Sequence, residues 1–379
     1  MTALSQPMAG KTRNELLCTL SIRRITSPGV LRLIALWLGV SLGCLKAQSP
    51  KLYFHHLNTS KGLLQASCSF VYHDSQDFVW ISSIEGLMRY DGQSIRTYRP
   101  NEADAKAIKG KNIQSHFFED SLGDIWFSSY DALNVYRRKT DDFDHFTIKN
   151  FHKDLKDPNY GVLLSERDKR LWVTVNNTLF WVRPDTSKEK IAWQYAGNIQ
   201  GKRACAEKSG TANIETFYTF DRSTNADAGF WEYQVGPDSI QLKNHFFSGE
   251  DALPSLKVNA ISVTGTDIVW VASNAGLVKF NKRTRAWEVF NEISSGLRIQ
   301  SSEGLAADDG NKLWVSSNIG LALFDQDSEK YIAFYPPVSD GPDGPAKPTA
   351  ELYLDPNRTL WCTVNKSGID FTALDKPKF

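Results

Sequence analysis

The chain has 379 residues, of which 41% are hydrophobic, with 44 basic and 43 acidic side chains. This length exceeds that of most single domains, although β folds built from repeats reach it as one unit. The near balance of charge excludes the strongly basic surface that is typical of nucleic-acid binding.

The first 47 residues have the pattern of a secretory signal peptide. Three arginines precede an apolar run over residues 33–45, and Ala47 supplies a small residue at the expected cleavage site. The run is too short to span a bilayer core, which needs about 20 residues. We expect cleavage before Gln48 and a periplasmic or secreted protein, with a lipid anchor at Cys44 as the alternative.

The mature part, residues 48–379, keeps 38 basic and 42 acidic side chains, a net charge of −4. We therefore expect no nucleic-acid partner, and no transmembrane segment after signal cleavage because no further apolar run approaches membrane length. Its three cysteines, Cys68, Cys205 and Cys362, are odd in number and widely spaced, which does not favour a disulfide framework. We expect buried thiols, with a Cys68–Cys362 bridge as the alternative.

A repeated tryptophan segment runs along the mature chain. Six such segments resemble one another, and their tryptophans are spaced by 46, 46, 98, 44 and 47 residues. The spacing of 98 equals two periods, so one unit has lost its tryptophan and seven units fill the chain. The tryptophans are Trp80, Trp126, Trp172, Trp270, Trp314 and Trp361.

Each unit contains the elements of one four-stranded blade. A short apolar strand leads into a turn, then come the tryptophan strand, a third strand after a short polar turn, and a fourth strand with paired aromatic residues. A turn-forming residue stands six places before the tryptophan: Asp74, Asp120, Glu166, Thr264, Asp308 or Asp355. An aspartate there accepts hydrogen bonds from the backbone N–H groups of the turn. Four antiparallel strands per 40–50 residues predict a seven-bladed β-propeller over 48–379, with the tryptophans packed between blades.

The chain ends supply the two parts of one blade. The last unit lacks its fourth strand, and residues 52–57 form a strand of the fourth type with no blade before it. We therefore expect residues 52–57 to pair beside residues 368–373, which closes the ring and removes an exposed sheet edge. The fourth unit fits strands at 203–208, 214–220, 229–235 and 240–246.

Residues 74–81 (Asp-Ser-Gln-Asp-Phe-Val-Trp-Ile) and 86–92 (Gly-Leu-Met-Arg-Tyr-Asp-Gly) resemble the two-component regulator propeller repeat. That repeat builds the periplasmic sensor domains of many hybrid histidine kinases, and the resemblance covers residues 53–371. It implies a sensor that binds an oligosaccharide or another extracellular cue. The second propeller, transmembrane helix and kinase of that family are not found in this sequence, so we expect a free-standing propeller, a partner of a separate membrane transducer or histidine kinase, or a truncated reading frame. The family has no portable set of ligand residues, so none is transferred.

The sequence contains no serine or cysteine nucleophile motif, no metal-spaced His/Cys cluster and no phosphate loop. The adjacent pair His55–His56 points to opposite faces of a strand and is unsuited to one metal ion. We therefore expect no enzyme activity, metal or cofactor. A protein-interaction scaffold and an exo-acting carbohydrate-active enzyme are the alternatives.

The candidate ligand residues lie in the turns between second and third strands. Propellers place these turns and the longer inter-blade connections on one face around the central funnel, where most ligands bind. The long connections are expected at 99–111, 149–160, 196–202, 247–257 and 336–348. Polar turn side chains that could hydrogen-bond sugar hydroxyls, or merely shape the turns, are Glu85, Asp131, Asn176, Asn274, Asn318 and Asn365.

Overall fold

The structure is a computed structural model. It describes residues 51–113, 115–147, 160–164, 171–182, 194–200, 203–206, 215–220, 229–236, 239–246, 257–293, 296–338, 345, 349–364 and 366–375. The predicted signal peptide and its cleavage site lie outside these residues. Residues 49–379 form one compact unit.

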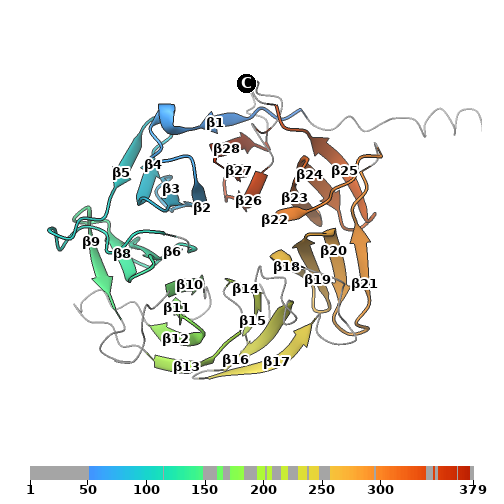
Figure 1. Cartoon of the computed structure of the whole chain (residues 1–379), viewed down its shortest axis with the longest axis horizontal. Helices are drawn as coiled ribbons and strands as arrows, with labels where there is room; N and C mark the ends of the chain where they lie inside the picture. The colour runs from blue at the N-terminus through green and yellow to red at the C-terminus, as the bar shows by residue number, and fades with distance from the viewer. Residues whose placement is uncertain are drawn as a thin grey trace, which may run out of the picture. The chain divides into compact units, whose positions relative to one another are not determined.

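Seven four-stranded antiparallel sheets follow one another around a ring, as the fold prediction required (Figure 1). The first three blades are β2 (Cys68–His73), β3 (Val79–Ser83), β4 (Leu87–Tyr90) and β5 (Ile95–Tyr98); β6 (Phe118–Glu119), β7 (Ile125–Ser128), β8 (Leu133–Arg137) and β9 (Asp142–Phe146); and β10 (Tyr160–Leu164), β11 (Leu171–Val175), β12 (Thr178–Val182) and β13 (Gln194–Asn198).

Blades 4 to 6 continue in the same order, and blade 7 takes three strands from the C-terminal end of the chain and one from the N-terminal end. The strands are β14 (Arg203–Ala206), β15 (Glu215–Phe220), β16 (Phe230–Val235) and β17 (Ile240–Phe246); β18 (Val258–Thr264), β19 (Ile268–Ser273), β20 (Gly276–Asn281) and β21 (Trp287–Phe290); β22 (Ser302–Asp308), β23 (Lys312–Ser317), β24 (Gly320–Asp325) and β25 (Lys330–Tyr335); and β26 (Thr349–Leu354), β27 (Thr359–Val364), β28 (Gly368–Ala373) and β1 (His55–Leu57). A short 3-10 helix, Thr59–Lys61, follows β1.

The predicted closure of the ring is confirmed. β1 pairs antiparallel with β28, and His56 stands opposite Asp370 in the register. The His56 Nδ1 atom lies 2.8 Å from the buried Asp370 carboxylate, while His55 stacks on Phe371 at 5.0 Å between ring centroids. Because the two histidines point to opposite faces of β1, each makes its own contact with the last strand of the chain.

The tryptophans lie where blades pack together, as predicted. None of the six repeat tryptophans exposes more than 4% of its surface. Trp80 packs with Phe127 of blade 2, and Trp361 packs with Ile81 of blade 1. Since each indole is covered by its own blade and by the following one, the tryptophans hold neighbouring sheets together.

In the five blades where it is described, the residue six places before the repeat tryptophan accepts the indole N–H. Asp74 Oδ1 accepts the backbone N–H groups of Gln76 and Phe78, both at 2.9 Å. Its Oδ2 accepts the Trp80 indole N–H at 2.7 Å. In blades 2, 6 and 7 the indole N–H likewise donates to Asp120, Asp308 and Asp355. In blade 5 it donates to the Thr264 hydroxyl oxygen. Glu166 lies outside the described residues.

Blade 4 follows the predicted strand pattern without a tryptophan in its second strand, where the other blades have the residue that packs at the seam, the junction with the next blade. The described strands cover 203–206, 215–220, 230–235 and 240–246, and residues 207, 208 and 214 lie outside the described part. Tyr218 is fully buried in the cluster that joins blade 4 to Val271 and Phe280 of blade 5. A tyrosine therefore takes the seam position.

The alternative of a Cys68–Cys362 disulfide is wrong, because both are free thiols. Burial raises the pKa of the Cys68 thiol to about 12 and that of Cys362 well above its usual value. The expectation of buried thiols is confirmed for Cys362, while Cys68 is half-buried. No helix in the described residues is long and apolar enough to cross a membrane.

Candidate functional site

The hairpins between second and third strands lie against the connections that enter the blades. Lys111 and Asn112, on the way into blade 2, bond through their backbones to two hairpins: the Asn112 N–H donates to Ile84 O at 2.9 Å, and the Tyr130 N–H donates to Lys111 O at 3.2 Å. The Asn318 N–H donates to Ser301 O at 3.1 Å in the same way. Hairpins and connections therefore share one face, called here the hairpin face, as predicted.

Two of the predicted ligand residues tie a hairpin to its connection. The Asn274 Oδ1 atom accepts the Lys257 N–H at 2.8 Å. The Asn318 Oδ1 atom accepts the N–H groups of Gln300 and Ser301 at 3.0 and 3.1 Å. Their side-chain oxygens thus hold backbone on the hairpin face.

The other predicted residues occupy the same kind of hairpin. Asn176 is exposed at the tip between β11 and β12, with a left-handed φ of 53°. Asn365 lies outside the described residues, between β27 and β28. The expected connection at 196–202 begins later than predicted, because β13 continues to Asn198.

Asn274 and Asn318 are the first residues of their hairpins. Glu85 and Asp131, in blades 1 and 2, are each the second residue of the corresponding hairpin. The first position in these two blades is held by Ile84 and Tyr130, which are 42% and 43% exposed. Since Ile84 and Tyr130 bond to consecutive residues of one connection, the two hairpin tips lie beside each other. We call Ile84, Glu85, Tyr130 and Asp131 the tip platform.

Sequence reasoning missed Ile84 and Tyr130. The signal that could have found them is an apolar or aromatic residue at the turn position where blades 3, 5, 6 and 7 have asparagine.

The tip platform rests on a fixed connection. Asn134, fully buried in β8, accepts the Lys109 N–H at 2.9 Å and donates to Lys109 O at 3.2 Å. Gly110 has φ +80°, and a Cβ there would lie 2.6 Å from the Asp131 carboxylate. Glycine therefore lets the connection approach Asp131 closely.

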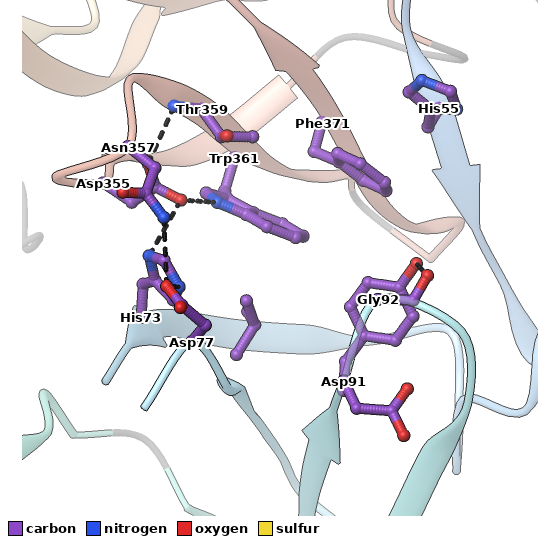
Figure 2. Close-up of a pocket in the computed structure, with 12 residues that line it drawn as sticks. His55, His73, Asp77, Asp91, Gly92, Asp355, Asn357, Thr359, Trp361 and Phe371 are labelled. Carbon is purple, nitrogen blue, oxygen red and sulfur yellow. Dashed lines mark hydrogen bonds and ion pairs between the residues drawn. The ribbon is translucent and has the colours of Figure 1, made fainter. Parts of the chain in front are cut away.

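A cavity lies between blades 7 and 1, at the strand ends opposite the hairpin face (Figure 2). We call it the seam cavity. Its volume is about 530 Å³. One wall carries stacked rings: Trp361 packs on Phe371 at 4.5 Å between centroids, and Phe371 packs on His55 at 5.0 Å. Tyr90 and Gly92 of blade 1 line the other side.

The floor of the seam cavity is polar. Asp355 is buried and accepts the Thr359 N–H and the Trp361 indole N–H, both at 2.8 Å. The His73 imidazole lies 3.4 Å from Asp355 Oδ2 and 3.3 Å from Asp77 Oδ1. Asn357 donates to Asp77 at 3.2 Å.

Exposed Asp91 adds a third carboxylate to the lining of the seam cavity. Hydrogen bonds from Ser94 and Gln93 lower its pKa to about 2. This side chain therefore stays ionised across the neutral range.

No protein-family model matches the chain, and no curated protein matches its sequence. The structure is similar to the extracellular domain of a hybrid two-component system from B. thetaiotaomicron, at 18% identity and a TM-score of 0.63, over 85% of this chain and 42% of that one. A second extracellular domain from that organism has 16% identity and a TM-score of 0.59, with 85% and 40% covered. Streptogramin B lyase has 13% identity and a TM-score of 0.54, with 86% and 98% covered.

The chain spans about two fifths of the length of the two extracellular domains. A protein named as a lyase shares the same architecture, so the fold alone does not choose between recognition and catalysis. The resemblance noted in the sequence is confirmed at the level of fold: the chain is a seven-bladed propeller similar to the extracellular domains of two hybrid two-component systems.

Proposed function

We propose that this protein is an extracellular recognition domain that binds an oligosaccharide on its hairpin face and does not chemically change it. The observation that carries the proposal is that one connection holds two hairpin tips side by side, one with the exposed Tyr130 and Asp131 and the other with Glu85. Its fold is that of extracellular domains of two-component systems, which supports a role in sensing.

The tip platform has the chemistry that sugars require. An aromatic ring packs against the C–H face of a pyranose, and carboxylates accept hydrogen bonds from its hydroxyl groups. Glu85 is 44% exposed, and its carboxylate lies 3.9 Å from Arg99, so its oxygens remain accessible. Because Asn134 fixes the connection between the two hairpins, little order is lost on binding.

The cellular setting follows from the same proposal. A signal peptide over residues 1–47 would export the chain to the periplasm or beyond, and a separate membrane transducer or histidine kinase would read the bound state. N-terminal sequencing of the exported protein tests the cleavage before Gln48. A lipid-modified N-terminus at Cys44 would replace the soluble form with an anchored one.

The test compares Tyr130→Ala with Tyr195→Ala, since Tyr195 is a 57% exposed tyrosine on the outer strand β13. Calorimetry against a glycan panel should show binding that Tyr130→Ala weakens about tenfold or more and Tyr195→Ala leaves unchanged. Chromatography should recover the sugar intact.

Shortened products would assign the protein to the carbohydrate-active enzymes. Binding that is equally strong in both variants would contradict the platform. Absence of any glycan binding, with a protein partner recovered in its place, would favour the interaction scaffold.

A further inference from the structure

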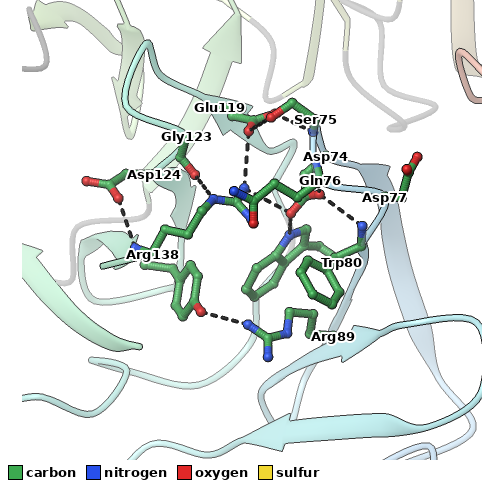
Figure 3. A network of polar contacts seen from close by, with 12 residues as sticks. Asp74, Ser75, Gln76, Asp77, Trp80, Arg89, Glu119, Gly123, Asp124 and Arg138 are labelled. Carbon is green, nitrogen blue, oxygen red and sulfur yellow. Dashed lines mark hydrogen bonds and ion pairs between the residues drawn. The ribbon is translucent and has the colours of Figure 1, made fainter. Parts of the chain in front are cut away.

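The seam between blades 1 and 2 is held by an arginine (Figure 3). Arg138 follows β8 of blade 2 and reaches back to Asp74 of blade 1, to which it donates at 3.0 Å. Its guanidinium also donates to Glu119 at 3.1 Å, to Gln76 Oε1 at 3.0 Å and to Gly123 O at 2.6 Å. A planar guanidinium thus satisfies four acceptors from two blades at once.

Two further seams use a cation from the following blade. Lys282 follows β20 of blade 5 as Arg138 follows β8, and it donates to Glu232 of blade 4 at 2.8 Å. Arg358, in the turn of blade 7, lies 2.9 Å from the Asp308 carboxylate of blade 6. A carboxylate of one blade therefore meets a positive side chain of the next.

The lining of the cavity between blades 7 and 1, as far as the chain is described, has no arginine or lysine at the corresponding place, and the His73 imidazole lies beside two of its carboxylates, Asp355 and Asp77. Tyr90 in blade 1 and Tyr136 in blade 2 have the same place in their blades, because each pairs with the residue before the repeat tryptophan. Two places later, blade 1 has Gly92 where blade 2 has Arg138. A Cβ at Gly92 would meet nothing within 4 Å, so the place of the arginine is open space.

The acceptors around Arg138 have counterparts that line the seam cavity. Each counterpart has the same place in its blade: Asp355 for Asp74, Asn357 for Gln76, His73 for Glu119, and Asp77 for Gly123. Asp77 and Gly123 share a left-handed backbone, with φ of 66° and 82°, which confirms the equivalence of the two turns.

The charges of the cavity also favour a cation. Its twelve lining residues include Asp77, Asp91 and Asp355 and neither lysine nor arginine. Arg358, which forms the ion pair with Asp308, stands three residues after the turn aspartate of blade 7. The same position in blade 1 is occupied by Asp77, which is acidic. The aromatic walls, Tyr90, Trp361 and Phe371, add ring faces that attract a guanidinium.

We propose that the seam cavity binds a guanidinium group supplied by a ligand, in the place that the Arg138 guanidinium occupies between blades 1 and 2. The proposal concerns the guanidinium group itself, which either a small molecule or an arginine of a partner polypeptide could carry. It lies at the opposite ends of the strands from the tip platform, so it is independent of the proposed glycan site.

The test uses calorimetry on the whole protein with N-acetyl-L-arginine amide as the probe. N-acetyl-L-citrulline amide has the same shape without the charge, and it should bind about tenfold more weakly or worse. Free L-arginine separates the two sources. It carries an α-ammonium and an α-carboxylate where the capped probe has two amide groups. Tighter binding of the capped probe therefore assigns a polypeptide arginine, and equal or tighter binding of free L-arginine assigns a small molecule.

Two variants locate the binding. Gly92→Arg places an arginine of the chain in the cavity and should abolish probe binding, while Gly265→Arg, at an equally open turn glycine with φ +67°, should not. Asp77→Gly restores the residue type found at Gly123 and should weaken binding about threefold without unfolding the protein. The latter keeps the test valid even if an arginine at position 92 prevents folding.

Conversely, Arg138→Gly opens the equivalent site between blades 1 and 2, and the arginine probe should restore part of its lost thermal stability. No heat with the arginine probe, equal affinity for the citrulline probe, or unchanged binding in both Gly92→Arg and Asp77→Gly would overturn the proposal. Glycan binding should be unaffected by Gly92→Arg, so the two proposals fail separately.

Discussion

The aspartate that precedes a blade tryptophan serves three groups at once. Asp74 fixes its turn, binds the Trp80 indole and receives Arg138 from the next blade. Because all three contacts converge on one buried carboxylate, the residue joins local structure to blade packing. Where the residue is Thr264, as in blade 5, the indole bond is kept by an uncharged hydroxyl at 3.1 Å.

Removing a seam tryptophan tests the packing role. Trp126→Ala should lower the free energy of unfolding by about 3–5 kcal/mol, because the 1% exposed indole leaves a cavity between blades 2 and 3. Trp287→Ala is the matched control, since Trp287 is 43% exposed, and it should cost less than about 1 kcal/mol. Urea unfolding measures both, and similar losses would contradict the packing role.

At the scale of elements, a strand of only three residues closes the ring. β1 contributes only His55–Leu57, yet it completes blade 7 with a regular register. Gly368, at the start of β28, lies so close to β1 that a Cβ there would fall on the Leu57 carbonyl oxygen. The glycine therefore permits the contact between the first and last strands.

Gly368→Ala tests this closure. It should lower the melting temperature markedly more than Gly265→Ala, because both positions have positive φ but only Gly368 adds a clash with β1. The shared backbone strain is about 1–2 kcal/mol, so the difference between the variants reports the displaced strand. Equal melting temperatures would show that β1 contributes little to closure.

At the scale of the whole molecule, charged groups between blades make stability depend on pH. Burial acts to raise the pKa of Glu232, but hydrogen bonds from Lys282, Asn244 and Tyr218 outweigh it and lower the pKa. A lowered pKa contributes stability that is present above the unfolded-state value, 4.5, and is lost as pH falls through the folded-state value. The junction of blades 4 and 5 should therefore weaken in acid.

Glu232→Gln should lower the free energy of unfolding at pH 7 by about 2 kcal/mol and should reduce the further loss between pH 7 and pH 3. Glu329→Gln, in the more exposed pair with Lys279, should have a much smaller effect at both pH values. Urea unfolding at the two pH values measures the difference. A parent and a Glu232→Gln protein with parallel pH profiles would contradict the linkage.

The sequence by itself determined the number of blades, their strands and the closure, because the repeat and the alternation of buried and exposed positions are local properties. Even blade 4, without its tryptophan, followed the predicted strands. The constant six-residue spacing could have predicted that the turn aspartates bind the indoles. The cations that pair with these aspartates could not be predicted from the spacing, because they come from the next blade.

Only the tertiary structure decided which side chains lie together on the hairpin face and in the seam cavity. Asn274 and Asn318, chosen from sequence as sugar ligands, hold backbone, while Tyr130 and Ile84 are brought together by a single connection. The seam cavity depends on residues from both ends of the chain, Gly92 and Asp355 among them. A site made by adjacent blades leaves no local pattern, because its parts become neighbours only when the ring closes.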